Sequence, residues 1–201
     1  MPNSTSNDPV AEHFRKSCDT LQQAAQDPVL RETLYKIAGT ITQAFRAGNK
    51  LYLAGNGGSA ADAQHIAAEF VSRLNFSRDP LPAIAFTTDT SALTAIGNDF
   101  GFDKVFERQV RGIARRGDVF IAISTSGQSP NILAALAAAR EIGVTTVGFT
   151  GNRQAPMTKL CDHCLAAPSP ETALIQQVHI VAAHIVCGLV EQDMFGGKAA
   201  G

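Results

Sequence analysis

The feature that most constrains the fold is an alternation that begins after Lys50. Short apolar runs take turns with helical stretches of ten or more residues, and each run has the length of one strand. The runs are Leu51–Ala54, Ala83–Phe86, Val119–Ile123, Thr146–Phe149 and Cys164–Ala167. Strands without a polar face are typical of a parallel sheet covered by helices on both sides. The sequence therefore predicts an α/β fold, with a doubly wound five-stranded parallel sheet flanked by helices.

Residues 10–48 precede this alternation and are predicted to form two helices. Apolar residues follow one stripe in residues 14–25 and a second stripe in residues 30–45, as expected for amphipathic helices. Asp27-Pro28 separates the two, because the residue before proline avoids the helical region. We expect residues 1–201 to form a single domain, in which segment 10–48 packs on the core and on partner subunits.

The charge of the chain limits its partners. Lys and Arg number 17 against 18 Asp and Glu, so the net charge is −1 at pH 7. This balance argues against nucleic acid and membrane surfaces as partners, because no excess of cations exists to neutralise phosphates. Charged residues make up only 17% of the chain, which leaves little to cover a monomer's surface. Segment Thr172–Met194 is apolar over a broad arc, so we expect its own sheet and a partner helix to bury it.

The ends and the cysteines point to the cytoplasm. The first 16 residues are polar and lack the apolar stretch of a signal peptide. The longest apolar segment, Ile180–Val190, is too short to span a bilayer. Cys161 and Cys164 form a CxxC motif, but neither a second pair of zinc ligands nor a helix start accompanies it. We interpret them as ordinary thiols of a cytoplasmic protein.

Two strand-to-helix loops share a composition suited to anions. Residues 55–60 are rich in glycine, and residues 124–129 are rich in hydroxyls. Both follow a predicted strand and open a helix, where free N–H groups attract negative charge. The second loop suits a phosphate monoester, whose oxygens accept many hydrogen bonds, and its hydroxyls belong to Ser124, Thr125, Ser126 and Ser129. The alternative is a hydroxyl-rich turn that caps the helix.

The first loop also fits a competing pattern. Gly55, Gly57 and Ala60 match the G-x-G-x-x-A fingerprint of dinucleotide-binding folds. That fingerprint needs an acidic residue at the end of the second strand, about 20 residues further on. Asp79 precedes the second predicted strand, and Asp89 lies too far along the chain. The dinucleotide interpretation is therefore a poor fit.

Two predicted helices carry histidines in settings that suggest chemistry. His65 and Glu69 are four residues apart, so they share one helix face with Cβ atoms about 5–6 Å apart. The last helix places His179 and His184 in an otherwise apolar segment, where a buried imidazole must hydrogen-bond or ligate something. A metal site, an acid/base pair and a plain surface pair all remain open on these residues alone.

Four separated blocks together resemble the phosphoheptose isomerases of the sugar isomerase (SIS) domain family. The blocks are Ala54–His65, Ile96–Phe102, Ser124–Ser129 and the helix from Gln176 to His184. The resemblance covers nearly the whole chain. It implies a homotetramer with active sites at subunit interfaces. It also implies conversion of sedoheptulose 7-phosphate to D-glycero-D-manno-heptose 7-phosphate, the entry to heptose for bacterial glycans.

The resemblance also assigns residues. It implies one zinc ion per subunit, held by His65, Glu69, Gln176 and His184, and it makes Glu69 and His184 the acid/base pair. The implied substrate contacts are Asn56, Gly57, Gly58, Glu69, Asn98, Asp99, Ser124, Thr125, Ser126, Ser129 and Gln176. Gln176 and His184 lie about 12 Å apart along an ideal helix, so one ion reaches both only after bending or across chains. His179 is the fallback ligand.

Ala173 departs from the family pattern, and SIS proteins of other functions resemble this chain. Some family members carry an aspartate where this chain has Ala173, so one polar contact to the substrate is either missing or supplied by Glu171 or Thr172. Similar SIS proteins bind the bacterial replication initiator protein as tetramers without isomerase activity. Those proteins lack the acid at the position of Glu69 and the serine at the position of Ser126, and this chain has both. A sugar-phosphate sensor without turnover is the remaining alternative.

Overall fold

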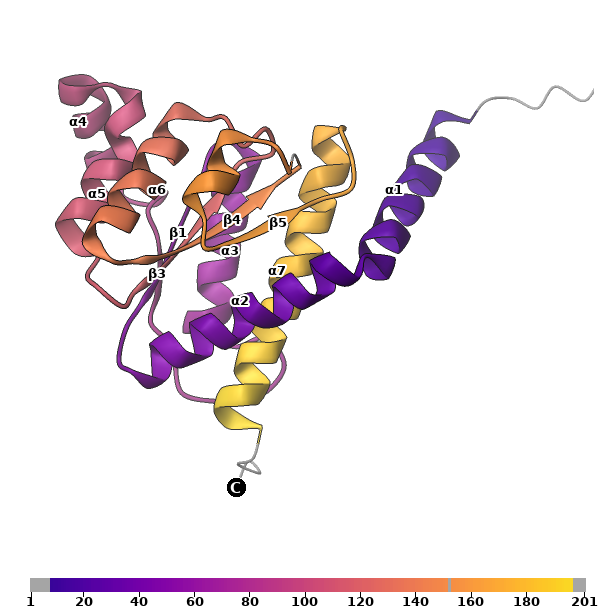
Figure 1. Cartoon of the computed structure of the whole chain (residues 1–201), viewed down its shortest axis with the longest axis horizontal. Helices are drawn as coiled ribbons and strands as arrows, with labels where there is room; N and C mark the ends of the chain where they lie inside the picture. Colours follow the sequence, from indigo (N-terminus) through magenta and orange to yellow (C-terminus); the bar gives the residue numbers. More distant parts are fainter. Residues whose placement is uncertain (1–7, 152, 197–201) are drawn as a thin grey trace, which may run out of the picture.

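The computed structural model describes residues 8–151 and 153–196, which contain a five-stranded parallel sheet (Figure 1). The strand order is β2-β1-β3-β4-β5, with neighbouring strands parallel throughout. The strands are β1 (Leu51–Gly55), β2 (Ala83–Ala85), β3 (Val119–Ile123), β4 (Thr145–Thr150) and β5 (His163–Ala166). Each predicted apolar run forms a strand, and the bounds differ by one residue or so. The predicted doubly wound α/β fold is confirmed.

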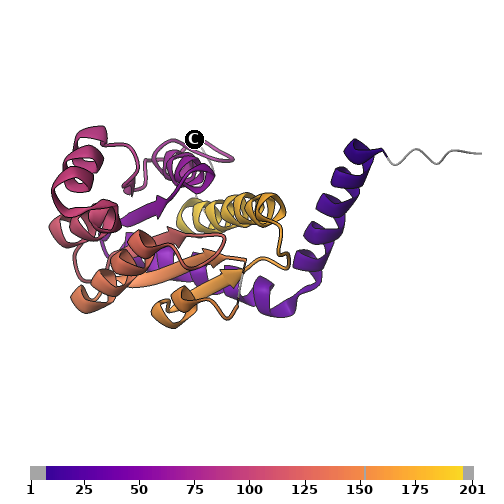
Figure 2. The same cartoon turned by 90° about the horizontal axis from the view of Figure 1, so that it is seen from above.

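Helices cover both faces of the sheet, each over its own core. One face packs against α2 (Pro28–Arg46), α3 (Gly58–Val71) and α7 (Thr172–Phe195). The other packs against α5 (Val105–Ile113), α6 (Pro130–Ile142) and the short 3-10 helix η2 (Pro156–Leu160). Figure 2 shows these layers from above. Helix α4 (Thr90–Phe100) and the 3-10 helix η1 (Phe102–Lys104) lie at the outer end of the second layer.

The strand order reverses between β1 and β3, which are neighbours in the sheet. The loop after β1 enters α3 on one face, and the loop after β3 enters α6 on the other. Two loops that diverge at this point leave a crevice at the carboxyl edge of the sheet, where ligands bind in open α/β folds. The two loops singled out in the sequence therefore flank one crevice.

Helix α1 (Pro9–Gln26) projects away from the rest of the molecule (Figures 1 and 2). The predicted break before α2 is present, because the Asp27 side chain accepts hydrogen bonds from the N–H groups of Val29 and Leu30 and caps α2. Helix α2 packs on the core, and so does the end of α1 through Leu21 and Ala24, but the start of α1 is exposed and the Phe14 side chain is 69% exposed. The expected packing of α1 on a partner subunit stays a prediction.

Helix α7 is the long apolar segment predicted from Thr172 onward. By length and composition alone it is able to cross a membrane, and half of its most apolar stretch is buried within the molecule. It packs against α1, α2 and α3 and contributes ten buried residues to the protein interior. A core helix of a soluble protein has these same properties, so the packing accounts for the composition.

Candidate active site

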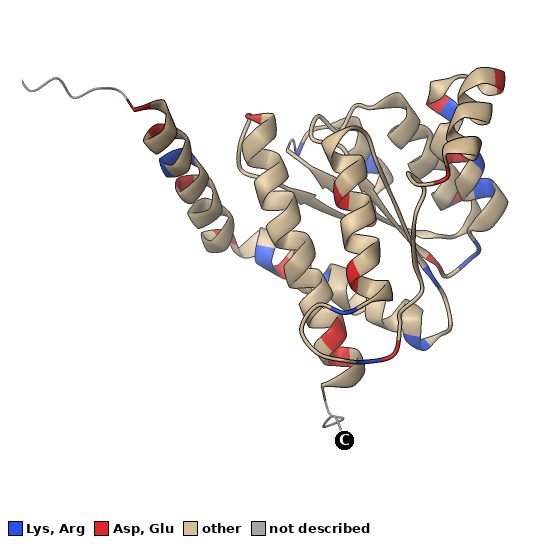
Figure 3. Cartoon of the chain, turned by 180° about the vertical axis from the view of Figure 1, so that it is seen from behind, with Lys and Arg blue, Asp and Glu red and all other residues tan. Residues whose placement is uncertain are grey.

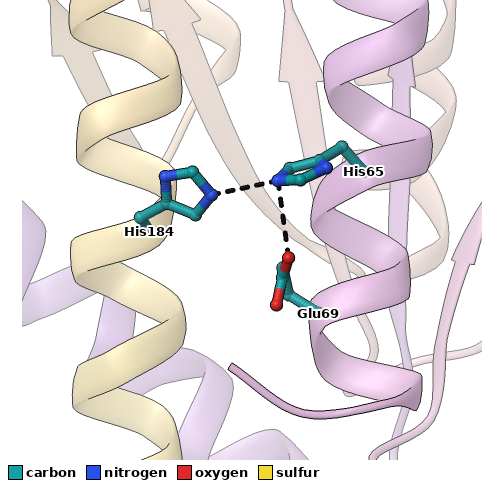
Figure 4. Close-up of side chains that lie close together, drawn as sticks. All are labelled: His65, Glu69 and His184. Atoms are coloured by element: carbon teal, nitrogen blue, oxygen red, sulfur yellow. Dashed lines mark hydrogen bonds and ion pairs between the residues drawn. The ribbon is translucent and has the colours of Figure 1, made fainter. Parts of the chain in front are cut away.

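Three polar side chains meet between the parallel helices α3 and α7 (Figure 4). His65 and Glu69 extend from successive turns of α3, and His184 reaches across from α7. The Nε2 atoms of the two histidines are 3.0 Å apart, and His65 Nε2 lies 3.4 Å from Glu69 Oε1. One ligand atom from each residue lies within 4.8 Å of the others. We refer to these three residues as the His–Glu–His cluster.

The two helices that carry this cluster contain acidic side chains and, apart from histidine, no basic ones. Neither α3 nor α7 contains Lys or Arg, and Figure 3 shows their ribbons interrupted only by acidic residues. The Glu69 side chain is 19% exposed, so solvent screens its charge only in part. Burial raises the pKa of Asp62, one turn before His65, although attraction to His65 opposes this shift. Two imidazoles and a carboxylate are the ligand types of many catalytic zinc sites.

Gln176, predicted as a fourth ligand, lies at a different level of the same two helices. Its amide nitrogen is 2.8 Å from the position that a Cβ on Gly58 would occupy, so it packs against the first residue of α3. Gly58 precedes His65 by seven residues, about 10 Å along the helix. Within one chain, Gln176 therefore faces the glycine-rich loop. Its service as a ligand stays a prediction that depends on another chain or on a bend.

His179, the fallback ligand, faces the sheet and not the cluster. The residue is 1% exposed, its Nε2 lies 3.2 Å from the carbonyl oxygen of Thr150, and its ring packs on Phe149. Burial lowers the pKa of His179 to about 4, which keeps the imidazole neutral at physiological pH. This position is that of a core histidine, and the structure does not bring it to the His–Glu–His cluster.

The loop after β3 is ordered by its own hydroxyls. Ser124 Oγ and Ser129 Oγ are 2.9 Å apart, and the N–H of Gly127 donates to Ser124 Oγ at 3.1 Å. Thr125 and Ser126 line a cavity of about 510 Å³ that reaches Gly151 and the start of α7 at Ile175. The predicted contacts Ser124, Thr125, Ser126 and Ser129 thus share one loop beside an open cavity. The N-cap of α6, Ser129, makes no side-chain capping bond, but Pro130 has no N–H and the N–H of Ile132 already donates to the carbonyl of Ser129, so an anion at this loop depends mainly on the hydroxyls.

The two loops are joined by a pair of amides: Asn56, which was predicted to contact substrate, and Asn131, which sequence analysis did not single out. Asn56 Nδ2 donates to Asn131 Oδ1, and Asn131 Nδ2 donates back to Asn56 Oδ1, both at 2.9 Å. Asn131 is 2% exposed and belongs to the first turn of α6. A polar residue directly after the helix-opening Pro130 was the available signal. Gly57, next to Asn56, has φ of 55°, a conformation that glycine adopts at no steric cost.

Asn98 and Asp99, predicted to contact substrate, lie on α4 and not beside the His–Glu–His cluster. Both are exposed residues of α4, and Asn98 Nδ2 donates to Asp99 Oδ1 at 2.8 Å. Helix α4 sits in the layer opposite α3 and α7 (Figures 1 and 2). The structure of one chain therefore does not bring these two residues to the His–Glu–His cluster.

A buried ion pair lies beside the end of α3 that carries Glu69. Sequence analysis did not predict this pair. Arg78 and Glu191 are 3% and 1% exposed, and Arg78 Nε donates to Glu191 Oε1 at 3.1 Å. Arg78 also donates to the backbone carbonyl of Glu69 at 2.8 Å, and Glu191 accepts from the N–H groups of Leu74 and Asn75. This pair ties the end of α3 to the end of α7. Its long sequence separation left no local signal.

Comparison with known proteins shows the family of the chain. The model of the SIS domain family matches residues 12–151. A phosphoheptose isomerase from Bradyrhizobium sp. (strain BTAi1) is 55% identical over 94% of this chain and 96% of its own length. The chain belongs to the phosphoheptose isomerase family. The enzyme from Aneurinibacillus thermoaerophilus is 48% identical over 96% of this chain and 97% of its own length.

Solved structures of this family have the same fold. The phosphoheptose isomerase from Neisseria gonorrhoeae superposes with a TM-score of 0.85 at 42% identity, covering 92% of this chain and 97% of that one. The enzyme from Francisella tularensis gives a TM-score of 0.88 at 31% identity, covering 94% and 99%. The resemblance identified from the four sequence blocks is confirmed, and the chain spans nearly the full length of its relatives.

Proposed function

We propose that this protein is an aldose–ketose isomerase that converts sedoheptulose 7-phosphate to D-glycero-D-manno-heptose 7-phosphate through an enediol. The observation that carries the proposal is the His–Glu–His cluster, which lies on helices of the layer that flanks the ligand-binding edge of the sheet. Membership of the family supports it, because relatives at 48% to 58% identity are named phosphoheptose isomerases. The proposal places the chain at the first step of bacterial heptose biosynthesis.

The reaction moves a proton between C1 and C2, so it needs a group that accepts the proton and returns it. Glu69 suits this task, because its carboxylate is partly shielded from solvent and adjoins His65 at 3.4 Å. His184 Nε2 lies 3.0 Å from His65 Nε2, so the two rings can exchange a proton. We assign His184 the transfer of protons to and from the sugar oxygens. The two residues come from different helices, so they can approach the substrate from two sides.

A zinc ion fits the same residues, because His65, Glu69 and His184 offer two nitrogens and one oxygen within 4.8 Å. When bound, such an ion acts as a Lewis acid that polarises the carbonyl and hydroxyl oxygens. A carboxylate that ligates a metal is a weaker base. Glu69 therefore serves the proton transfer best when its second oxygen is free. We propose one zinc ion per subunit, with Gln176 completing the set from a rearranged helix or a second chain.

The phosphate of the substrate is proposed to bind at the loop of residues 124–129. Its hydroxyls are donors for the terminal oxygens, and the adjoining cavity of about 510 Å³ leaves room for the sugar chain. Binding the phosphate at one end fixes the position of C1 and C2 at the other. No lysine or arginine of the loop takes part, because residues 124–129 contain none.

We propose that the working form is a cytoplasmic homotetramer with active sites at subunit interfaces. An apolar groove of about 300 Å³ runs between α1, α2 and α7, and Val181 and Ile185 of α7 are 41% and 44% exposed beside it. The exposed α1 supplies an apolar stripe of its own. A second copy of the chain would cover both surfaces and would bring another subunit's α4, with Asn98 and Asp99, near a cluster it does not reach within one chain.

The deciding experiment supplies sedoheptulose 7-phosphate and zinc to the purified protein and follows the appearance of the aldose by NMR. Formation of the heptose 7-phosphate supports the isomerase. No turnover in a zinc-loaded, folded tetramer would overturn it. Binding of sedoheptulose 7-phosphate without turnover would then favour the sensor, and binding of the replication initiator protein would favour the non-catalytic tetramer.

Elemental analysis tests the metal. We expect about one zinc per chain in the wild type, a marked loss in His184→Ala, and no loss in the matched variant His179→Ala, because only His184 belongs to the cluster. Zinc lost from His179→Ala but kept in His184→Ala would reverse the assignment of ligands.

A further inference from the structure

The CxxC motif, interpreted from the sequence as two ordinary thiols, becomes a close pair in the structure. Cys161 follows η2 and Cys164 lies on β5, directly beside Gly148 of β4. Their Sγ atoms are 2.6 and 3.0 Å from the position that a Cβ on Gly148 would occupy. The two sulfurs therefore lie on the same side of Gly148, and both residues are partly buried. The missing side chain at position 148 is what makes room for both sulfurs.

This pair lacks the partners of a metal site. Among the described residues, the one group of three or more His, Cys, Asp and Glu side chains near enough to share an ion is the His–Glu–His cluster. His163, between the two cysteines, lies on the opposite side of β5 and has its Nε2 3.1 Å from Thr40 Oγ1. Asp162 accepts hydrogen bonds from the N–H and hydroxyl of Thr146. Two neighbouring thiols without further ligands leave thiol–disulfide exchange as the chemistry open to this pair.

We propose that Cys161 and Cys164 form a thiol–disulfide exchange site that takes a low-molecular-weight disulfide, and that closing the protein disulfide weakens sugar-phosphate binding. Cys164 Sγ attacks one sulfur of the small disulfide, whose S–S bond breaks and whose other half leaves and takes up a proton. Cys161 then loses its proton and attacks Cys164 Sγ, which displaces the second half as a thiol. The dithiol is oxidised by two electrons, and the small disulfide is reduced to two thiols.

The order of attack follows from the surroundings of the two sulfurs. The hydrogen bond from Cys161 lowers the pKa of Cys164, and the same bond, with burial, raises the pKa of Cys161. Cys164 is therefore the thiol that reaches the reactive thiolate form. Cys164 also lines a surface cavity of about 190 Å³, together with Thr158, Arg153 and the start of α2, and this cavity gives a small reagent access to the pair. Once Cys164 is in a mixed disulfide, its sulfur is no longer an anion that stabilises the protonated form of Cys161. Cys161 can then lose its proton.

The pair is linked to the phosphate loop through η2. Met157 Cε lies 3.0 Å from the same Cβ position of Gly148 that both sulfurs approach. The N–H of Met157 donates to the carbonyl of Gly127 at 3.2 Å, and the Ala155 side chain packs tightly against Gly127. Gly127 is the centre of the loop of residues 124–129. Disulfide formation brings the sulfurs to about 2.05 Å and so moves the end of η2, which rests on that loop.

Mass spectrometry of the intact protein tests the exchange site. The Cys18→Ser variant removes the exposed thiol of α1 and is treated with oxidised glutathione. We expect the loss of two hydrogens, a peptide link between Cys161 and Cys164, and full reversal by dithiothreitol. The further variant Cys161→Ser should instead retain one glutathione on Cys164. A stable glutathione adduct, or no reaction, in the protein that holds both thiols would overturn the proposal.

Kinetics test the link to the phosphate loop, and this part rests on the proposed function. The oxidised protein should show a several-fold higher KM for sedoheptulose 7-phosphate at unchanged zinc content. The matched double variant Cys161→Ser with Cys164→Ser should keep its KM after the same treatment. A disulfide that forms without a change in KM would overturn the link. An inactive reduced protein would count against the isomerase and leave the mass result standing.

Discussion

The interface between α3 and α7 and the exposed helix α4 both carry residues predicted to contact substrate, but the polar groups of the two regions differ in how many partners they have within the chain. At the α3–α7 interface, polar groups from the two helices meet: His65 with His184, and Glu191 with the turn after α3. On α4, the side chain of Asn98 hydrogen-bonds to its neighbour Asp99 and to no other residue that the structure describes. A single chain thus brings the cluster together, whereas the proposed role of Asn98 and Asp99 needs a second subunit. The following predictions test this division.

The largest effect is expected at the α3–α7 interface itself. Glu69→Gln keeps the size of the side chain but removes the carboxylate that accepts the proton, so turnover should fall by about 10²- to 10⁴-fold. The tetramer and its thermal stability should be unchanged. Steady-state kinetics with gel filtration measures both. An active Glu69→Gln variant would remove Glu69 from the mechanism and shift the chemistry away from this interface.

The next effect is a loss of stability when the buried Arg78–Glu191 ion pair between the ends of α3 and α7 is broken. Arg78→Met leaves the carboxylate of Glu191 buried without its cation, which should cost about 3–5 kcal/mol of unfolding free energy. The control Lys16→Met breaks the pair with Glu171, whose side chains are 46% and 51% exposed, and should cost less than about 1 kcal/mol. Urea unfolding measures both values. Equal costs would show that the buried pair does not fix the interface.

A third effect concerns the pH dependence of stability, which depends on His179 on the side of α7 that faces the sheet. The pKa of His179 is about 4 in the folded chain and about 6.5 in the unfolded chain, which therefore binds more protons between these values. His179 should make stability fall as pH decreases from 6.5 to 4, by about 3 kcal/mol in total, with no further loss from this residue below pH 4. His179→Gln should flatten that part of the profile, measured by urea unfolding from pH 4 to 7. An unchanged slope would contradict a neutral, buried imidazole.

The smallest effect is expected on α4. Asn98→Ala removes a hydrogen bond proposed to reach substrate from another subunit, so KM should rise about tenfold, the equivalent of about 1.4 kcal/mol. Zinc content should stay the same, because α4 lies apart from the cluster in the chain. Altered zinc binding in Asn98→Ala would show that α4 acts on the α3–α7 interface after all, and the contrast between the two regions would fail.

Local patterns predicted most of the fold and paired two of the three residues of the His–Glu–His cluster. The five strands and the break at Asp27 follow from apolar runs and from proline, which act within a few residues. His65 and Glu69 could be paired because a spacing of four is a local property of a helix. The meeting of His65 with His184 depends on how α3 and α7 lie side by side. That alignment is set by contacts distant in sequence, such as Arg78 with Glu191.

The choice between His179 and His184 shows the same limit. The two residues are five positions apart, which is about 140° around a helix, so they point in different directions. Sequence shows that each interrupts an apolar segment, but it does not show which side of α7 the sheet occupies. Both histidines belong to α7. In the structure His179 contacts the backbone of β4, and His184 contacts His65 of α3. The apolar arc of α7 was too broad to reveal this difference.

The parallel course of α3 and α7 also bears on how this chain tolerates insertions and deletions. Gln176, His184 and Glu191 meet Gly58, His65 and the segment after Phe70 in the same order along both helices. Removing one residue between Gln176 and His184 would turn the rest of α7 by about 100° and shift it by about 1.5 Å. His184 and Glu191 would lose their partners together. Length changes are therefore expected to survive in the surface loops and to be eliminated from the middle of α7.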